Sequence, residues 1–142
     1  MAKTRVVFVC TQNAARSQMA EAFLRRLAPD RCEASSAGIA PTELDPLAVR
    51  AMAEVGIDIS GQQAKSLQSL LAADRFDFLV TLCDDAATDC ATSPADMMRL
   101  HWPVADPAAV DGDEDDRLEA YRAARDEIHA RIRAWLGVAL AA

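Results

Sequence analysis

The sequence has 142 residues, of which 51% are hydrophobic, and a formal net charge of -7. This length suits one domain whose core needs no metal or disulfide support, so we expect a single domain spanning residues 1–142. The negative charge argues against a nucleic-acid-binding protein. The lack of a signal-peptide pattern and of any apolar run of roughly 18 residues predicts a cytoplasmic protein with no membrane partner.

Strands and helices are predicted to alternate along the chain. A β-branched, apolar run indicates a first strand at residues 4–9, and an apolar period near 3.6 residues indicates a helix at residues 17–27. The elements expected after these are a strand at 32–36, helices at 45–55 and 66–73, strands at 76–82 and 99–104, and a helix at 113–136. This order predicts an α/β fold with a central four-stranded parallel sheet flanked by helices.

Three side chains that could take part in catalysis follow predicted strands. Cys10 ends the first strand, Cys83 follows the third, and Asp106 lies just past the fourth. In parallel sheets, ligands bind beyond the carboxyl ends of the strands. We therefore expect the three residues to face one edge of the sheet.

The loop from Cys10 to Ser17 has the pattern Cys-x5-Arg-Ser between a buried strand and a helix N-terminus. Backbone N–H groups in such a loop can cradle a tetrahedral oxyanion, and the Arg16 guanidinium can grip two of its oxygens. The same positive field would stabilise a thiolate at Cys10, with a further hydrogen bond from Ser17. The predicted oxyanion-binding residues are Thr11, Gln12, Asn13, Ala14, Ala15 and Arg16. The alternative is a buried cysteine that caps a strand, with an unrelated surface arginine.

The other cysteines are not a structural framework, because cytosolic thiols are kept reduced. Cys83 and Cys90 lie seven positions apart. On a helix this spacing is a rise of about 10 Å, whereas a disulfide needs Cα atoms about 5.5 Å apart, so oxidation would distort the segment. The alternative to a redox-active pair is two unconnected cysteines. A zinc site is not expected, because no histidine is suitably spaced with them. Cys32, in a predicted strand, is expected to be a buried bystander.

The loop and its setting resemble the low-molecular-weight tyrosine phosphatase superfamily. Within it, the run Cys-Thr-Gln-Asn-Ala-Ala-Arg-Ser-Gln-Met-Ala-Glu is more similar to the thioredoxin-coupled arsenate reductases than to the phosphatases, which usually have Gly and Cys where this chain has Gln12 and Ala15. The resemblance continues through residues 35–38, 55–60 and 102–107 and weakens after Pro107. One departure is Ala91, where the reductases usually have proline.

This resemblance implies that Cys10 attacks arsenate and that Asp106 acts as the general acid. Cys83 then releases arsenite by forming a disulfide with Cys10, and Cys90 takes over that disulfide for reduction by thioredoxin. A low-molecular-weight thiol system is the alternative reductant. Phosphate and sulfate are the expected competing oxyanions. No organic cofactor or catalytic metal is implied, and we expect a monomer.

A cation position is also suggested by the resemblance. Asn13, Glu21 and Ser36 match residues that bind potassium in some of these reductases, but the fourth position, usually aspartate, falls on Lys65. An ammonium group there could occupy the place of the cation, so potassium binding is doubtful. The alternative is an ordinary solvated lysine.

Two other functions use the same scaffold. A phosphatase needs Cys10, Arg16 and Asp106 without the other cysteines, but Ala108 and Ala109 replace the tyrosines that often grip an aryl substrate in phosphatases. A weak phosphatase side activity is nevertheless expected. The other rival is a non-enzymatic domain that binds an oxyanion or senses thiols, which would show ligand-dependent partner binding without turnover.

Overall fold

The computed structural model describes residues 3–83 and 97–139 of the chain. Its sheet contains strands β1 (Thr4–Cys10), β2 (Cys32–Gly38), β3 (Phe78–Thr81) and β4 (Met98–His101) in the order β2-β1-β3-β4, with every neighbouring pair parallel. The helices are α1 (Arg16–Leu27), α2 (Pro46–Ala53), α3 (Leu67–Ala73), the 3-10 helix η2 (Pro107–Ala109) and α5 (Glu114–Ala139). The predicted α/β fold with a four-stranded parallel sheet is confirmed. No helix in the described part is long and apolar enough to cross a membrane.

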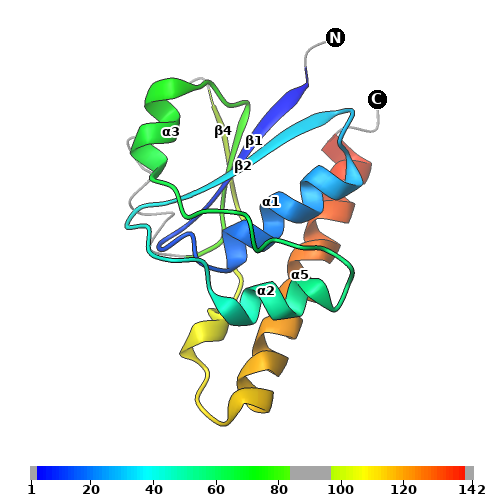
Figure 1. Cartoon of the computed structure of the whole chain (residues 1–142). Coiled ribbons are helices and arrows are strands. Elements are labelled where there is room, and N and C mark those ends of the chain that lie inside the picture. Colours follow the sequence, from blue (N-terminus) through cyan, green and yellow to red (C-terminus); the bar gives the residue numbers. More distant parts are fainter. Residues whose placement is uncertain (1–2, 84–96, 140–142) are drawn as a thin grey trace.

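Helices cover both faces of the sheet, and α3 lies on the face opposite α1, α2 and α5 (Figure 1). The alternation of β1 explains this arrangement, because successive strand side chains point to opposite faces. Val6 and Phe8 pack into the core under α1, α2 and α5, whereas Val7 and Val9 pack with Leu67 of α3. With both of its faces covered, β1 is buried along most of its length.

Several elements differ from their predicted bounds by a few residues. β1 and β2 reach further than expected because their register continues to the pair Cys10 and Gly38. β3 is shorter than the predicted 76–82, because its ladders to β1 and β4 cover four residues. β4 ends at His101 rather than 104, and Pro103, which has no N–H to donate, lies within the predicted extension.

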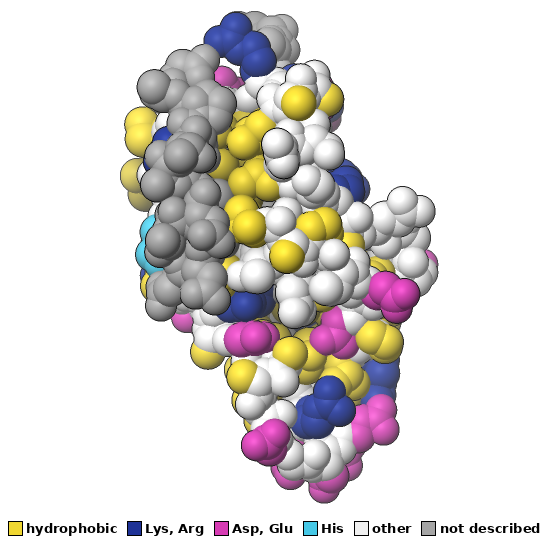
Figure 2. Space-filling view, turned by 90° about the vertical axis from the view of Figure 1, so that its left-hand side faces the viewer, with side chains coloured by type: hydrophobic (Ala, Val, Ile, Leu, Met, Phe, Trp, Pro, Cys, Tyr) yellow, Lys and Arg dark blue, Asp and Glu magenta, His cyan; other side chains and the backbone are white. Residues whose placement is uncertain are grey.

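Two helices begin one residue after their predicted starts, because the residue expected to be helical serves as an N-cap. The Asp45 side chain accepts a hydrogen bond from the Leu47 N–H, and the Ser66 side chain accepts one from the Ser69 N–H. α5 begins beside the acidic run of residues 111–116, which is exposed. Acidic side chains gather at that end of the molecule in Figure 2, where negative charge suits the helix dipole.

Candidate active site

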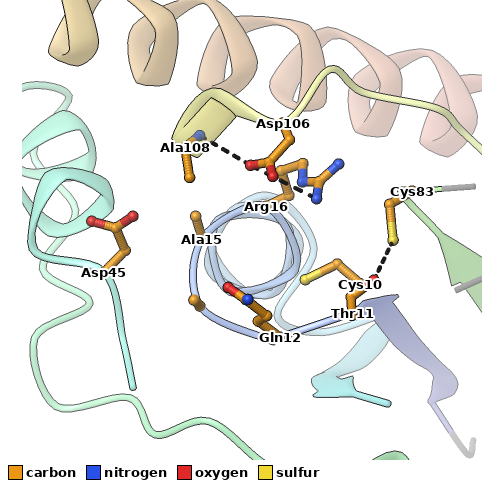
Figure 3. A pocket seen from close by; sticks show the side chains of 10 residues that line it. Cys10, Thr11, Gln12, Ala15, Arg16, Asp45, Cys83, Asp106 and Ala108 are labelled. Carbon is orange, nitrogen blue, oxygen red and sulfur yellow. Dashed lines mark hydrogen bonds and ion pairs between the residues drawn. The ribbon is translucent and has the colours of Figure 1, made fainter. Parts of the chain in front are cut away.

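The carboxyl edge of the sheet carries a pocket of about 410 Å³. Cys10 at the end of β1, Cys83 just after β3, and Asp106 at the start of η2 all line it. The other lining residues are Thr11, Gln12, Ala14, Ala15, Arg16, Asp45 and Ala108 (Figure 3). The fold thus brings together three residues that are far apart in the sequence.

Four carbonyl groups of the loop between β1 and α1 accept hydrogen bonds from residues outside this loop. The hydrogen bonds run from Ala40 N to Thr11 O (2.8 Å), from Thr42 N to Gln12 O (3.0 Å), from Gln18 Nε2 to Asn13 O (3.0 Å) and from Asp45 N to Ala14 O (2.9 Å). In a trans peptide the N–H of the next residue points away from the carbonyl. Holding these four carbonyls on the outside therefore turns the N–H groups of residues 12–15 toward the pocket, where they can bind an oxyanion.

Gly38 lets the end of β2 approach this loop closely. A Cβ atom at Gly38 would lie 2.8 Å from Thr11 O and 2.9 Å from Asn13 N, both shorter than the contacts that real Cβ atoms make. Backbone atoms cannot move aside as a flexible side chain can. A glycine is therefore required where the second strand supports the loop.

The Cys10 thiol is buried and lies 2.9 Å from the Ser17 hydroxyl. The Ser17 oxygen also accepts a hydrogen bond of 2.8 Å from Asn13 Nδ2. The Ser17 hydrogen is then free to point at the sulfur, as a hydroxyl that stabilises a thiolate must do. Asn13 itself is buried and has a positive φ of 53°, a conformation that Asn adopts more readily than most residues.

Arg16 lies between the loop and the segment that follows β4. Its Nη1 donates to the Val104 carbonyl at 2.8 Å, and its Nη2 lies 3.9 Å from Asp106 Oδ1. The Asp106 side chain is 49% exposed and accepts a hydrogen bond from the Ala108 N–H. This places a carboxyl group at the mouth of the pocket, open to water and beside the guanidinium that would hold a substrate.

Cys83 stands on the other side of the pocket from Asp45 (Figure 3). Its sulfur lies 3.3 Å from Thr11 Oγ1, and the residue is partly exposed. A second thiol therefore shares the pocket with Cys10. Cys90 falls within residues 84–96, outside the described part of the chain.

The four predicted cation-site residues also lie close together. Lys65 Nζ is 3.6 Å from Glu21 Oε1, which accepts a hydrogen bond of 2.8 Å from Ser36 Oγ. The Lys65 N–H donates to Asn13 Oδ1 at 2.8 Å. Arg25 Nη2 lies 3.1 Å from the other Glu21 oxygen. The Glu21 side chain is only 4% exposed, so its carboxylate needs such partners.

The sequence did not single out three residues that lie near the site, namely Gln18, Asp45 and Tyr121. Gln18 binds the loop from α1, and the Tyr121 hydroxyl donates to Asp45 at the pocket wall. Burial, with a contribution from this hydrogen bond, raises the pKa of Tyr121 above its usual range. Asp before Pro at a helix start is a recognisable N-cap signal, but nothing local predicts that Tyr121, 76 residues further on, meets Asp45.

The sequence from residue 5 to residue 142 matches the family model described as low molecular weight phosphotyrosine protein phosphatase. The chain belongs to this family. Within the low molecular weight phosphatase family, an arsenate reductase of Shouchella clausii (strain KSM-K16) is 45% identical over 133 residues, which cover 94% of this chain and 95% of the relative. The predicted resemblance is therefore confirmed.

Solved structures agree with the family assignment. An arsenate reductase from Archaeoglobus fulgidus has a TM-score of 0.76 and 32% identity, covering 93% of this chain and 98% of that one. A thioredoxin-dependent arsenate reductase from Corynebacterium glutamicum has a TM-score of 0.74 and 28% identity, covering 99% of this chain and 64% of that one. This family member is thus similar to arsenate reductases in both sequence and fold.

Proposed function

We propose that this chain reduces arsenate to arsenite, with Cys10 as nucleophile and Cys83 as the second thiol. The observation that carries the proposal is that Cys10 and Cys83 line one pocket together with Arg16 and residues of the loop between β1 and α1. Ester hydrolysis does not require a second thiol beside the nucleophile. Reduction requires one, because two thiols that become a disulfide supply the two electrons that convert As(V) to As(III).

The first step forms the sulfur–arsenic bond. Arsenate binds to the N–H groups of residues 12–15 and to Arg16, and the Cys10 thiolate attacks the arsenic atom. An arsenic–oxygen bond breaks, and Asp106 gives its proton to the departing oxygen, which leaves as water.

The second step transfers the electrons. The Cys83 thiolate attacks the Cys10 sulfur, the sulfur–arsenic bond breaks, and its electron pair remains on arsenic, so that arsenite departs and a Cys10–Cys83 disulfide forms. Cys90 then attacks Cys83 and frees Cys10, leaving a Cys83–Cys90 disulfide. Reduced thioredoxin exchanges with that disulfide and restores both thiols.

We place the reaction in the cytoplasm, where thioredoxin keeps thiols reduced. The similarity to a thioredoxin-dependent reductase supports this choice of partner. The test is a coupled assay in which the protein, thioredoxin, thioredoxin reductase and NADPH are mixed with arsenate. Steady NADPH consumption is the expected result. If a glutathione or mycothiol system supports turnover and thioredoxin does not, thioredoxin is not the reductant. If neither supports turnover, the proposed function is wrong.

A phosphatase side activity uses part of the same site. Cys10, Arg16 and Asp106 suffice for ester hydrolysis, and phosphate has the shape and charge of arsenate. We expect slow hydrolysis of a small aryl phosphate such as p-nitrophenyl phosphate. The pocket wall of Ala108, Asp45 and Asp106 offers no aromatic ring to stack on a phosphotyrosine.

Potassium is expected to leave both the melting temperature and the turnover of this protein unchanged relative to sodium. Lys65 Nζ lies 3.6 Å from Glu21 Oε1 and donates to the Gln63 carbonyl at 2.9 Å. The ammonium group thus supplies a positive charge to a buried carboxylate, and a bound cation beside it would be repelled. Thermal melts and coupled assays in matched KCl and NaCl measure both quantities.

The variant Lys65→Asp should gain a potassium-specific rise in melting temperature, because it exchanges the ammonium for a carboxylate that can ligate a cation. Its matched control, Lys65→Met, should lose stability without being rescued by potassium. A potassium-specific rise in the melting temperature of the unmutated protein would show that Lys65 does not replace the cation.

A further inference from the structure

We propose that Gln18 is a positioning residue of the oxyanion site. Its side-chain amide holds the Asn13 carbonyl on the outside of the loop, and so turns the Ala14 N–H toward the substrate. The same amide keeps Asn13 in the conformation that supports the contact between Ser17 and Cys10. Gln18 does not line the pocket, so it acts through Asn13 rather than on the substrate itself.

The donors that hold the loop carbonyls are of two kinds. The carbonyls of residues 11, 12 and 14 are bound by backbone N–H groups of residues 40, 42 and 45. The Asn13 carbonyl is bound by a side chain, Gln18 Nε2, at 3.0 Å. One peptide of the loop therefore depends on the identity of a single side chain, and the others do not.

The backbone of Asn13 has a conformation that is uncommon for a residue other than glycine. Its φ of 53° lies in the left-handed region, which a non-glycine residue keeps when its surroundings hold it there. Gln18 Nε2 lies 3.0 Å from Asn13 O and 3.1 Å from Asn13 Oδ1. Because Gln18 Nε2 also donates to Gln63 O, its two hydrogens serve three oxygens, and one hydrogen is shared. Together with the Lys65 N–H that donates to Asn13 Oδ1, this contact holds the main chain and the side chain of Asn13, which leaves Asn13 Nδ2 directed at Ser17 Oγ.

Gln18 is itself held in place by its neighbours. Its side chain is fully buried in α1. Its Nε2 also donates to the Gln63 carbonyl at 2.9 Å, and its Oε1 accepts from Gln62 Nε2 at 2.7 Å. These partners define which end of the amide is nitrogen, because carbonyl oxygens surround Nε2 and an N–H group faces Oε1.

The test uses Gln18→Met, which keeps the length of the side chain but cannot donate a hydrogen bond. We expect phosphate to protect Cys10 from iodoacetamide about tenfold more weakly than in the wild type, the effect of losing one hydrogen bond to a charged group. Alkylation of Cys10 without phosphate should also slow severalfold at pH 7, because the Ser17 contact is loosened. Peptide mass spectrometry follows Cys10 separately from the other cysteines.

Two matched controls separate positioning from general stability. Gln62→Met removes the donor to Gln18 Oε1 but keeps the contacts of Gln18 Nε2 with Asn13 and Gln63, so its effect on protection should be smaller than that of Gln18→Met. Ile128→Val shortens a fully buried side chain of α5 and should lower the melting temperature while leaving Cys10 reactivity unchanged. If Gln18→Met does not fold, Gln18→Ala, a good helix former, serves the same test.

Wild-type phosphate protection in a folded Gln18→Met or Gln18→Ala protein overturns the proposal. An equal loss of protection in Ile128→Val overturns it as well. The inference rests on the oxyanion site of the proposed function, but phosphate protection requires no turnover, so a protein that fails the arsenate assay still tests it. If phosphate does not protect Cys10 in the wild type, the oxyanion site and this inference are both wrong.

Discussion

Cys10→Ser is expected to abolish arsenate reduction and the phosphatase side activity together, each by at least about a thousandfold. Both reactions begin with attack by the same sulfur, and an alkoxide is not available at neutral pH to replace a thiolate. The change is nearly isosteric, and the new hydroxyl can still bond to Ser17. The variant should therefore fold normally and still bind phosphate.

Coupled NADPH consumption and hydrolysis of p-nitrophenyl phosphate measure the two activities, and a thermal melt checks the fold. Cys32→Ser is the matched control. Cys32 is buried at the start of β2, and burial raises the pKa of its thiol, which keeps it protonated and unreactive. It should retain both activities. If Cys10→Ser keeps either activity near the wild-type level, Cys10 is not the nucleophile of that reaction.

Alkylation gives an independent view of the same thiol. The hydrogen bond from Ser17 and the N–H groups of residues 12–15 favour a thiolate at Cys10, so iodoacetamide should modify it rapidly below pH 8. Bound phosphate should slow the modification. If Cys10 reacts no faster than a free thiol, Ser17 and the loop N–H groups do not stabilise a thiolate there.

Much of this site follows from local sequence patterns. A strand followed by Cys-x5-Arg-Ser and a helix places Cys10, Arg16 and Ser17 at the two ends of one short loop, because Cys10 ends β1 and the other two residues begin α1. The parallel sheet then brings Cys83 and Asp106 to the same edge, since the carboxyl ends of its strands lie together. The positions of these residues can be predicted from the order of the elements and a regular parallel sheet alone.

Other features depend on tertiary contacts that leave no local trace. Gln18 sits in an amphipathic helix, where a polar residue would ordinarily be solvated, yet it is fully buried against the loop. Its partners at residues 62 and 63 lie between the helices predicted at 45–55 and 66–73, in a segment for which no element was predicted. The pairing of Tyr121 with Asp45 likewise depends on how α5 crosses α2. The ends of β3 and β4 shifted because ladder pairing, rather than hydrophobicity, decides where a strand stops.

The three-cysteine relay makes separate predictions for its last two thiols. Cys83→Ser should still form the Cys10 adduct, but it cannot release arsenite by an internal disulfide, so multiple turnover should be lost. Cys90→Ser should release arsenite and stall as the Cys10–Cys83 disulfide. It should turn over about once without an added thiol. Phosphatase side activity should survive in both variants, because ester hydrolysis needs only the loop and Asp106.

Single-turnover mixtures, trapped with acid and alkylating agent and mapped by mass spectrometry, would identify each disulfide. Cys10–Cys83 should accumulate in Cys90→Ser, and Cys83–Cys90 in the wild type, while Cys32→Ser cycles normally. The seven-residue spacing of Cys83 and Cys90 would be a rise of about 10 Å on a helix, whereas a disulfide needs Cα atoms about 5.5 Å apart. From this spacing we expect oxidation to rearrange the segment in the wild type. Sustained thioredoxin-coupled reduction by Cys90→Ser would refute the relay, because the Cys10–Cys83 disulfide lies at the pocket and thioredoxin would then have to reach it directly. Cys10 would remain the nucleophile in that case.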